Sequence, residues 1–111
     1  MTSDVDSRLR DKLQAVAEQY DQITEQLGDP KVAGDPNLSI RLAKEMGRLR
    51  RLAEPFRDYC RMFDQLEEAQ SIVADSEQDA ELRKLAREEI PDLQEDCDRR
   101  WESLKESLVT A

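Results

Sequence analysis

The feature that most constrains the fold is a long stripe of apolar residues in the middle of the chain. Between Leu42 and Val73 the apolar positions recur mostly at intervals of three and four residues, which is the period of one face of an α-helix. A helix of this length is about 45 Å long, and a single helix with one apolar face is not stable alone in water. The pattern therefore predicts a central helix that other helices cover.

Two more apolar stripes predict the covering helices. The first helix is expected at about residues 4–27, the central helix at 36–74 and the third at 79–108, and no segment has the alternation of a strand. Short connections make neighbouring helices antiparallel. We therefore predict an all-α fold, an antiparallel three-helix bundle with a long kinked central helix, formed as a single helical domain over residues 1–111. The stripe of the first helix includes Val5, Leu9, Leu13 and Ile23, and that of the third includes Leu82, Leu85, Leu93, Cys97, Trp101 and Leu104.

Prolines and glycines mark where the helices end or bend. Gly28, which tolerates the left-handed conformation that often stops helices, is expected to end the first helix. The connection that follows is a loop with room for one helical turn after Asp29, and Pro36 suits the first position of the central helix. Pro55 cannot donate a backbone hydrogen bond, so we expect a kink there; a break that restarts the helix is the alternative. Pro91 is expected to bend the third helix.

The expected overlap of the three helices predicts the thickest part of the core. Folding the chain about Glu77 places Trp101 near Ala53 on the central helix. The two cysteines, Cys60 and Cys97, belong to apolar stripes and are interpreted as small buried thiols that stay reduced. The predicted core residues are Leu9, Leu13, Leu49, Leu52, Phe56, Trp101 and Leu104.

Charge and hydropathy exclude several classes of protein. The 111 residues include 26 acidic and 17 basic side chains, for a net charge of −9, whereas a dedicated nucleic-acid-binding domain is basic. Independent binding to nucleic acid is therefore not expected. No apolar run approaches the length of about 18 residues that spans a membrane, and the N-terminus has no signal-peptide core. A cytoplasmic location is the expectation.

Residues for catalysis or metal binding are scarce. The chain has no histidine and no glycine-rich phosphate loop, so we expect no enzyme activity, no metal site and no cofactor. Acidic clusters around Glu67 and Asp96 are the remaining candidates for acid–base chemistry. They lie on polar helix faces among Arg and Lys, and we interpret them as solvated surfaces with weak ion pairs.

One basic pattern is a candidate contact surface. Its residues recur at intervals of three, four and three on the helix face opposite the apolar stripe, and Arg50 lies beside them. In so acidic a chain, a positive stripe can meet phosphates or an acidic partner; the alternative is a face that only aids solubility. We call this set the basic stripe, and it consists of Arg41, Lys44, Arg48 and Arg51.

The order of these signals resembles a known family. The segments that carry the likeness, in chain order, are Leu27-Gly28-Asp29-Pro30, Leu42-Ala43-Lys44-Glu45-Met46, Arg57-Asp58-Tyr59, Leu66-Glu67-Glu68-Ala69, Asp79–Ala86 and Glu88–Leu93. Together they resemble the N-terminal domain of bacterial class I peptide chain release factors, of the type that reads UAA and UAG. The likeness covers nearly the whole chain.

The resemblance implies a role in translation termination. Such factors direct stop-codon-dependent release of the nascent peptide on the ribosome through a Gly-Gly-Gln loop. The three glycines here, Gly28, Gly34 and Gly47, are never adjacent, so that loop is absent. We therefore expect a noncatalytic docking module of a larger factor.

The resemblance also implies partners. They are the factor-binding region of the large ribosomal subunit near the stalk base, and the class II release factor GTPase. The basic stripe is our own candidate for the ribosome contact, because the resemblance supplies no contact residue there. The alternative function is a free-standing helical adaptor or coiled-coil interaction protein.

Overall fold

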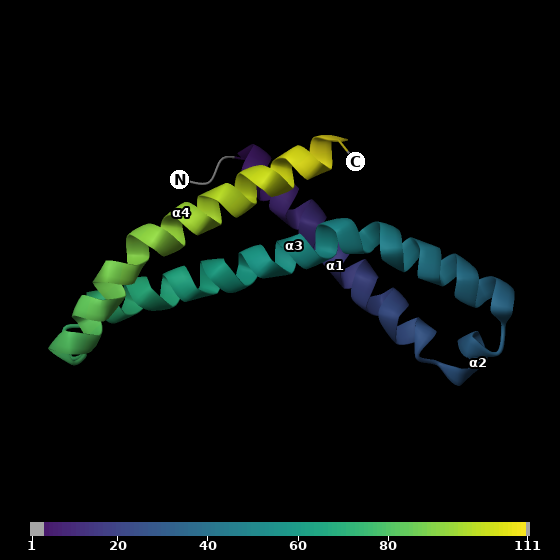
Figure 1. Ribbon diagram of the computed structural model, residues 1–111, viewed down its shortest axis with the longest axis horizontal. Coiled ribbons are helices and arrows are strands. Elements are labelled where there is room, and N and C mark those ends of the chain that lie inside the picture. The colour runs from purple at the N-terminus through teal and green to yellow at the C-terminus, as the bar shows by residue number, and fades with distance from the viewer. Residues whose placement is uncertain (1–3, 111) are drawn as a thin grey trace. The chain divides into compact units, whose positions relative to one another are not determined.

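The computed structural model describes residues 4–110, and they are almost entirely helical (Figure 1). The helices are α1 (Asp4–Leu27), α2 (Pro30–Ala33), α3 (Pro36–Ala74) and α4 (Ala80–Thr110). No strand occurs between residues 4 and 110. The all-α fold class is confirmed, and the three long helices lie within two residues of their predicted bounds. Among the described helices, none is long and apolar enough to cross a membrane.

The connection between α1 and α3 contains the helical turn expected after Asp29. The side chain of Asp29 accepts a hydrogen bond from the backbone N–H of Lys31 at 2.9 Å and so caps α2. The hydroxyl of Ser39, near the start of α3, donates to the carbonyl of Val32 at 2.7 Å. The second bond ties α2 to the start of α3.

Helix α1 ends at Leu27, directly before Gly28, as predicted. No described glycine has a positive φ, so α1 does not end in a left-handed residue. Instead the backbone N–H of Gly28 bonds to the carbonyl of Glu25 at 3.0 Å, and that of Asp29 bonds to Gln26 at the same distance. This tight last turn satisfies the final carbonyls of α1 without the left-handed geometry.

Helix α3 continues through Pro55 without a break. The predicted continuity is therefore confirmed, and the alternative of a helix that restarts at Pro55 is not observed. Pro55 is exposed, as is Pro91 inside α4. A carbonyl that loses its bond to a proline on the outer face can bond to water instead, so the helix tolerates the residue.

The structure divides into two compact units, the first ending at Arg57 and the second beginning at Asp58. In the first unit, α1 runs opposite to the first part of α3. Tyr20 of α1 accepts a hydrogen bond from the Nε of Arg50 at 3.4 Å, and Thr24 donates to the sulfur of Met46 at 3.6 Å. The buried side chains of this unit are Leu13, Ala17, Ile23, Leu49, Ala53 and Phe56.

In the second unit, α4 returns along the second part of α3 (Figure 1). The ring of Trp101 packs against Tyr59, with 5.3 Å between the ring centroids and 36° between the planes. Tyr59 in turn lies 6.0 Å from Phe63. Tyr59 is buried, although the apolar period assigns its neighbour Cys60 to the stripe. The other buried side chains here are Leu66, Ala69, Ala86, Cys97 and Leu104.

Tyr59 is an aromatic partner of Trp101 that the predicted register did not name. Folding about Glu77 placed Trp101 near Ala53, but its ring partner Tyr59 lies more than one helical turn further along α3. A fold point taken from the middle of a turn ignores side-chain size. Here two large rings, tilted by 36°, pack against each other in the core.

Burial confirms most of the predicted core and corrects its ends. Leu13, Leu49, Phe56, Trp101 and Leu104 are buried as predicted, whereas Leu9 and Leu52 are half-buried. Three residues assigned to the apolar stripes are exposed. They are Val5 (63%), Leu82 (42%) and Leu85 (56%). Periodicity identifies the face on which a side chain lies, but a neighbouring helix must also reach it to bury it.

The cysteines are free thiols, as predicted. Cys97 is buried and Cys60 is half-buried. Burial raises the pKa of the Cys97 thiol, and the neighbouring charges of Asp96 and Asp98 raise it further. A thiol with a raised pKa is a poor nucleophile, so Cys97 fills space in the core.

Candidate functional site

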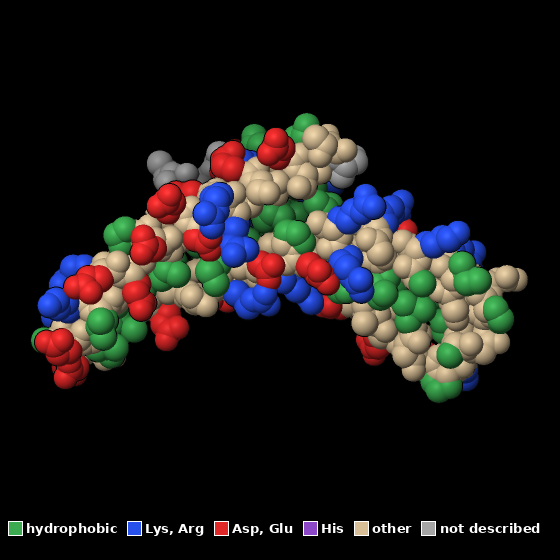
Figure 2. Space-filling view, in the orientation of Figure 1, with side chains coloured by type: hydrophobic (Ala, Val, Ile, Leu, Met, Phe, Trp, Pro, Cys, Tyr) green, Lys and Arg blue, Asp and Glu red, His purple; other side chains and the backbone are tan. Residues whose placement is uncertain are grey.

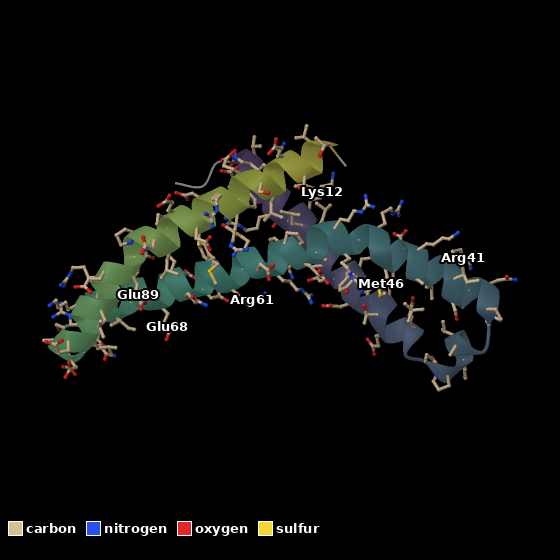
Figure 3. The ribbon with its side chains drawn as sticks, viewed as in Figure 1. Lys12, Arg41, Met46, Arg61, Glu68 and Glu89 are labelled. Carbon is tan, nitrogen blue, oxygen red and sulfur yellow. The ribbon has the colours of Figure 1, made fainter. Side chains whose placement is uncertain are left out.

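The basic stripe lies on the exposed face of the first part of α3. All four of its side chains are exposed, while Leu49 and Ala53 on the opposite face are buried. Figure 2 shows Lys and Arg side chains gathered over this part of the helix, and Figure 3 shows Arg41 extending away from it. The structure therefore brings the predicted residues together on one surface.

Most of the stripe is not neutralised by other side chains among the described residues. Arg48 pairs with Glu45, one turn before it, through Nη2 and Oε1 at 2.6 Å. Among residues 4–110, no carboxylate forms an ion pair with Arg41, Lys44 or Arg51. Three cations at one surface, with no internal partner, are available to an anion from outside.

Arg50 is not part of this surface. Its Nε contacts Glu54 at 3.4 Å and donates to the hydroxyl of Tyr20 on α1. Arg57, two turns further along α3, pairs with Asp21 of α1. This pairing lowers the pKa of the Asp21 carboxyl. The arginines on this flank of α3 therefore hold the two helices together, whereas the stripe points outward.

The centre of the stripe is flat. Gly47 lies between Lys44 and Arg51 on the same face, and a Cβ placed there would meet nothing within 4 Å. A glycine inside a helix costs about 0.5–1 kcal/mol relative to alanine. At this position the glycine leaves the helix backbone without a covering side chain between Lys44 and Arg51.

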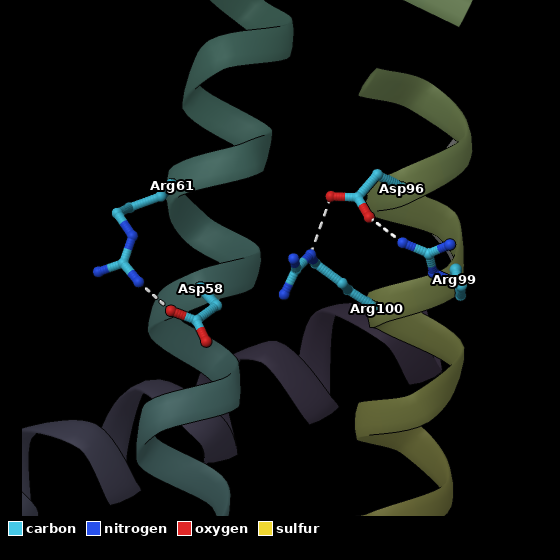
Figure 4. A network of polar contacts seen from close by, with 5 residues as sticks. All are labelled: Asp58, Arg61, Asp96, Arg99 and Arg100. Atoms are coloured by element: carbon cyan, nitrogen blue, oxygen red, sulfur yellow. Dashed lines mark hydrogen bonds and ion pairs between the residues drawn. The ribbon is translucent and has the colours of Figure 1, made fainter. Parts of the chain in front are cut away.

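Asp96, one of the acidic candidates for catalysis, is held in ion pairs. Asp96 accepts a hydrogen bond from the Nε of Arg100 at 2.9 Å and pairs also with Arg99 (Figure 4). The hydrogen bond to Arg100 is the main reason why the pKa of Asp96 is lowered. A general acid needs a raised pKa, so this shift has the wrong sign. Across residues 4–110, no group of three or more metal-binding side chains is present.

The Asp96 pairing gives a measurable prediction. Replacing Arg100 with glutamine removes the main cause of the shift, so the pKa of Asp96 should rise toward its ordinary value of 3.8. Carboxyl NMR titration of the two proteins measures this. Arg99→Gln is the matched control and should raise the pKa less. An equal or larger rise in the Arg99 variant would contradict the assignment.

The same pairing makes a pH-dependent contribution to stability. Because the pKa of Asp96 is lower in the folded chain, the pair stabilises the fold above the pKa of the unfolded chain. That contribution should be lost as the pH falls through the folded pKa. In the Arg100→Gln protein, the acid side of the stability profile should therefore be flatter.

Comparison with known proteins identifies the family. Residues 16–111 match the model of the PCRF domain. The chain is 35% identical over 99 residues to a protein of Listeria welshimeri named peptide chain release factor 1, a match that covers 89% of this chain. Proteins of the same name from Bacillus cytotoxicus and Bacillus licheniformis are 36% identical over 84 residues and 30% over 99 residues. No solved structure matches.

Each match covers most of this chain but only about a quarter of the relative's length. This chain spans 27% of the Listeria protein, 23% of the Bacillus cytotoxicus protein and 28% of the Bacillus licheniformis protein. The likeness to class I release factors that the sequence motifs indicated is confirmed. Because the family model covers most of the chain, this protein belongs to the PCRF domain family.

Proposed function

We propose that this chain acts in translation termination, as a noncatalytic helical module of a peptide chain release factor that docks on the ribosome. The match of residues 16–111 to the PCRF domain carries this proposal. The names of the relatives support it, and so does the type that the sequence motifs resemble, which reads UAA and UAG. The alternative, a free-standing helical adaptor, is not favoured by the family match.

The partners follow from the same proposal. The ribosome is the main one, at the factor-binding region near the stalk base, and the class II release factor GTPase is the second. Asp21 and Asp96 are not suited to act as general acids, because arginine partners lower the pKa of both carboxyls. The cytoplasm is where such a module would work.

The basic stripe is the docking surface in this proposal. The segment 36–57 carries six basic and two acidic side chains, whereas the whole chain has a net charge of −9. The chain as a whole is therefore repelled by ribosomal RNA and attracted to it only locally. Such a pattern orients the module, since only one face can approach a negatively charged surface. It also agrees with the expectation that naked nucleic acid is not bound.

The test is binding of the labelled chain to bacterial ribosomes. Replacing Arg41, Lys44, Arg48 and Arg51 with glutamine should raise the Kd about tenfold or more, because several charge-assisted contacts are lost together. The salt dependence of binding should fall as well. The matched control removes four exposed cations elsewhere, namely Arg8, Lys12, Lys31 and Lys84. Equal weakening by both sets, or no binding by the unmodified chain, would refute docking through the stripe.

Gly47→Ala separates folding from docking. It should increase the free energy of unfolding by about 0.5–1 kcal/mol, because the added Cβ meets nothing. It should also weaken ribosome binding, since the methyl group holds the partner away from the helix. Urea unfolding and the same binding assay measure the two effects. If stability rises and affinity stays unchanged, the flat centre of the stripe has no part in docking.

A further inference from the structure

The second unit has an open apolar groove between the last turns of α3 and the first turns of α4. Its volume is about 260 Å³, below the roughly 300–1,000 Å³ of small-molecule pockets. It has room for one or two apolar side chains and not for a cofactor. Its apolar lining is Ala69, Ile72, Leu82, Leu85, Ala86 and Leu93.

Two leucines in this groove are unusually exposed. Leu82 is 42% exposed and Leu85 is 56% exposed, although Ala69 and Ala86 beside them are buried. Burying a leucine side chain fully is worth about 1.5–3 kcal/mol. Part of that stabilisation is still available to whatever covers the groove.

The rim of the groove is acidic. Glu68 of α3 and Glu89 of α4 both line it, and Figure 3 labels them near this end of the two helices. Neither carboxylate forms an ion pair with a cation among residues 4–110. Two uncompensated negative charges therefore flank the exposed leucines.

A row of acids continues beyond Leu85 on α4. Three acids share one helix face with Leu85. In chain order the four residues of this face are Glu81, Leu85, Glu88 and Asp92, at intervals of four, three and four. All four side chains are exposed. Figure 2 shows acidic side chains along this end of α4, with Lys and Arg side chains beside them. An apolar surface bordered by acids on both sides selects a partner that is apolar in the middle and basic at its edges.

We propose that this groove binds an amphipathic helix of a partner protein, with apolar side chains on one face and Lys or Arg on both flanks. The apolar face would cover Leu82 and Leu85 in the manner of a helix lying in a groove. The basic flanks would pair with Glu68 and Glu89. The groove belongs to the second unit and the basic stripe to the first, so this proposal can fail while docking through the stripe holds.

A second copy of the chain fits this groove poorly. Two such surfaces brought face to face would place acidic rims against each other, in a chain that already has a net charge of −9. Like charges in direct opposition disfavour association. The charge of the rim therefore favours a basic partner.

The probe for the test is a synthetic helical peptide of leucine and lysine, labelled for fluorescence anisotropy and titrated with the 111-residue chain. A peptide with glutamate in place of lysine is the first control. The variants are Leu82→Ser with Leu85→Ser, and Glu68→Gln with Glu89→Gln. The matched charge control is Glu25→Gln with Glu106→Gln, two exposed acids outside the groove. It separates specific pairing from general attraction of a cationic peptide to an acidic chain.

The expected result is saturable binding of the lysine peptide with one site per chain. The serine variants should raise the Kd about tenfold, and the groove glutamine variants about fivefold. The Glu25 and Glu106 variants should change it less than twofold. All the replaced side chains are exposed, so circular dichroism should show an unchanged fold.

Three results would overturn the proposal. Equal weakening by both glutamine pairs would reduce the binding to non-specific charge attraction. Binding unaffected by the serine variants would place the peptide elsewhere. Self-association of the chain in sedimentation equilibrium, abolished by the serine variants, would make a second copy the occupant of the groove.

Discussion

Replacing Trp101 with alanine is expected to lower the free energy of unfolding by about 3–5 kcal/mol, which is a large share of the stability of a small domain. The indole is 9% exposed and packs on Tyr59 with a centroid distance of 5.3 Å. The substitution removes this aromatic pair, itself worth about 0.5–1.5 kcal/mol, and leaves a cavity between α3 and α4. Urea unfolding followed by far-UV circular dichroism measures the loss.

Trp101→Phe is the matched variant. It keeps a ring against Tyr59 and should lose less than half as much stability as the alanine variant. A loss below about 1 kcal/mol for Trp101→Ala would contradict the position of this side chain in the core. In the unmodified chain, burial also predicts that the fluorescence of Trp101 is blue-shifted and poorly quenched by iodide.

The second large effect is expected at Leu13. Its side chain is 0% exposed, and replacing a buried leucine with alanine costs about 2–5 kcal/mol, because apolar contacts are lost and a cavity remains. Thermal and urea unfolding should both show the loss.

Val5→Ala is the control for Leu13→Ala on the same helix. Val5 belongs to the apolar stripe predicted for α1 but is 63% exposed, so its truncation should change the free energy of unfolding by less than about 0.5 kcal/mol. A loss at Val5 as large as at Leu13 would mean that the whole stripe is covered, which the structure does not show.

The helices could be predicted from the sequence because their signals are local. Apolar spacing set the faces of α1, α3 and α4, and Asp29 and Pro36 marked the connection between α1 and α3. The continuity of α3 through Pro55 was predictable for the same reason, since the stripe keeps its phase across the proline. The basic stripe was found in this way as well, because charges three and four residues apart share a face of any helix.

What escaped prediction depends on contacts between helices. Tyr59 and Cys60 are adjacent, and helical period alone did not decide which would be buried; the ring of Trp101 did. The role of Arg50 was likewise decided by Tyr20 on α1 rather than by its neighbours in sequence.

The sequence by itself determined the all-α class, the bounds of the long helices and the exposed basic stripe, because each follows from backbone propensity and helical period. Only the tertiary structure decided how α4 aligns with α3, which arginines are engaged and which are free, and that Leu82 and Leu85 remain uncovered. The physical reason is that burial and ion pairing are properties of two surfaces in contact. Helical periodicity identifies the apolar face of one helix. The packing of large side chains decides which face of a neighbouring helix covers it.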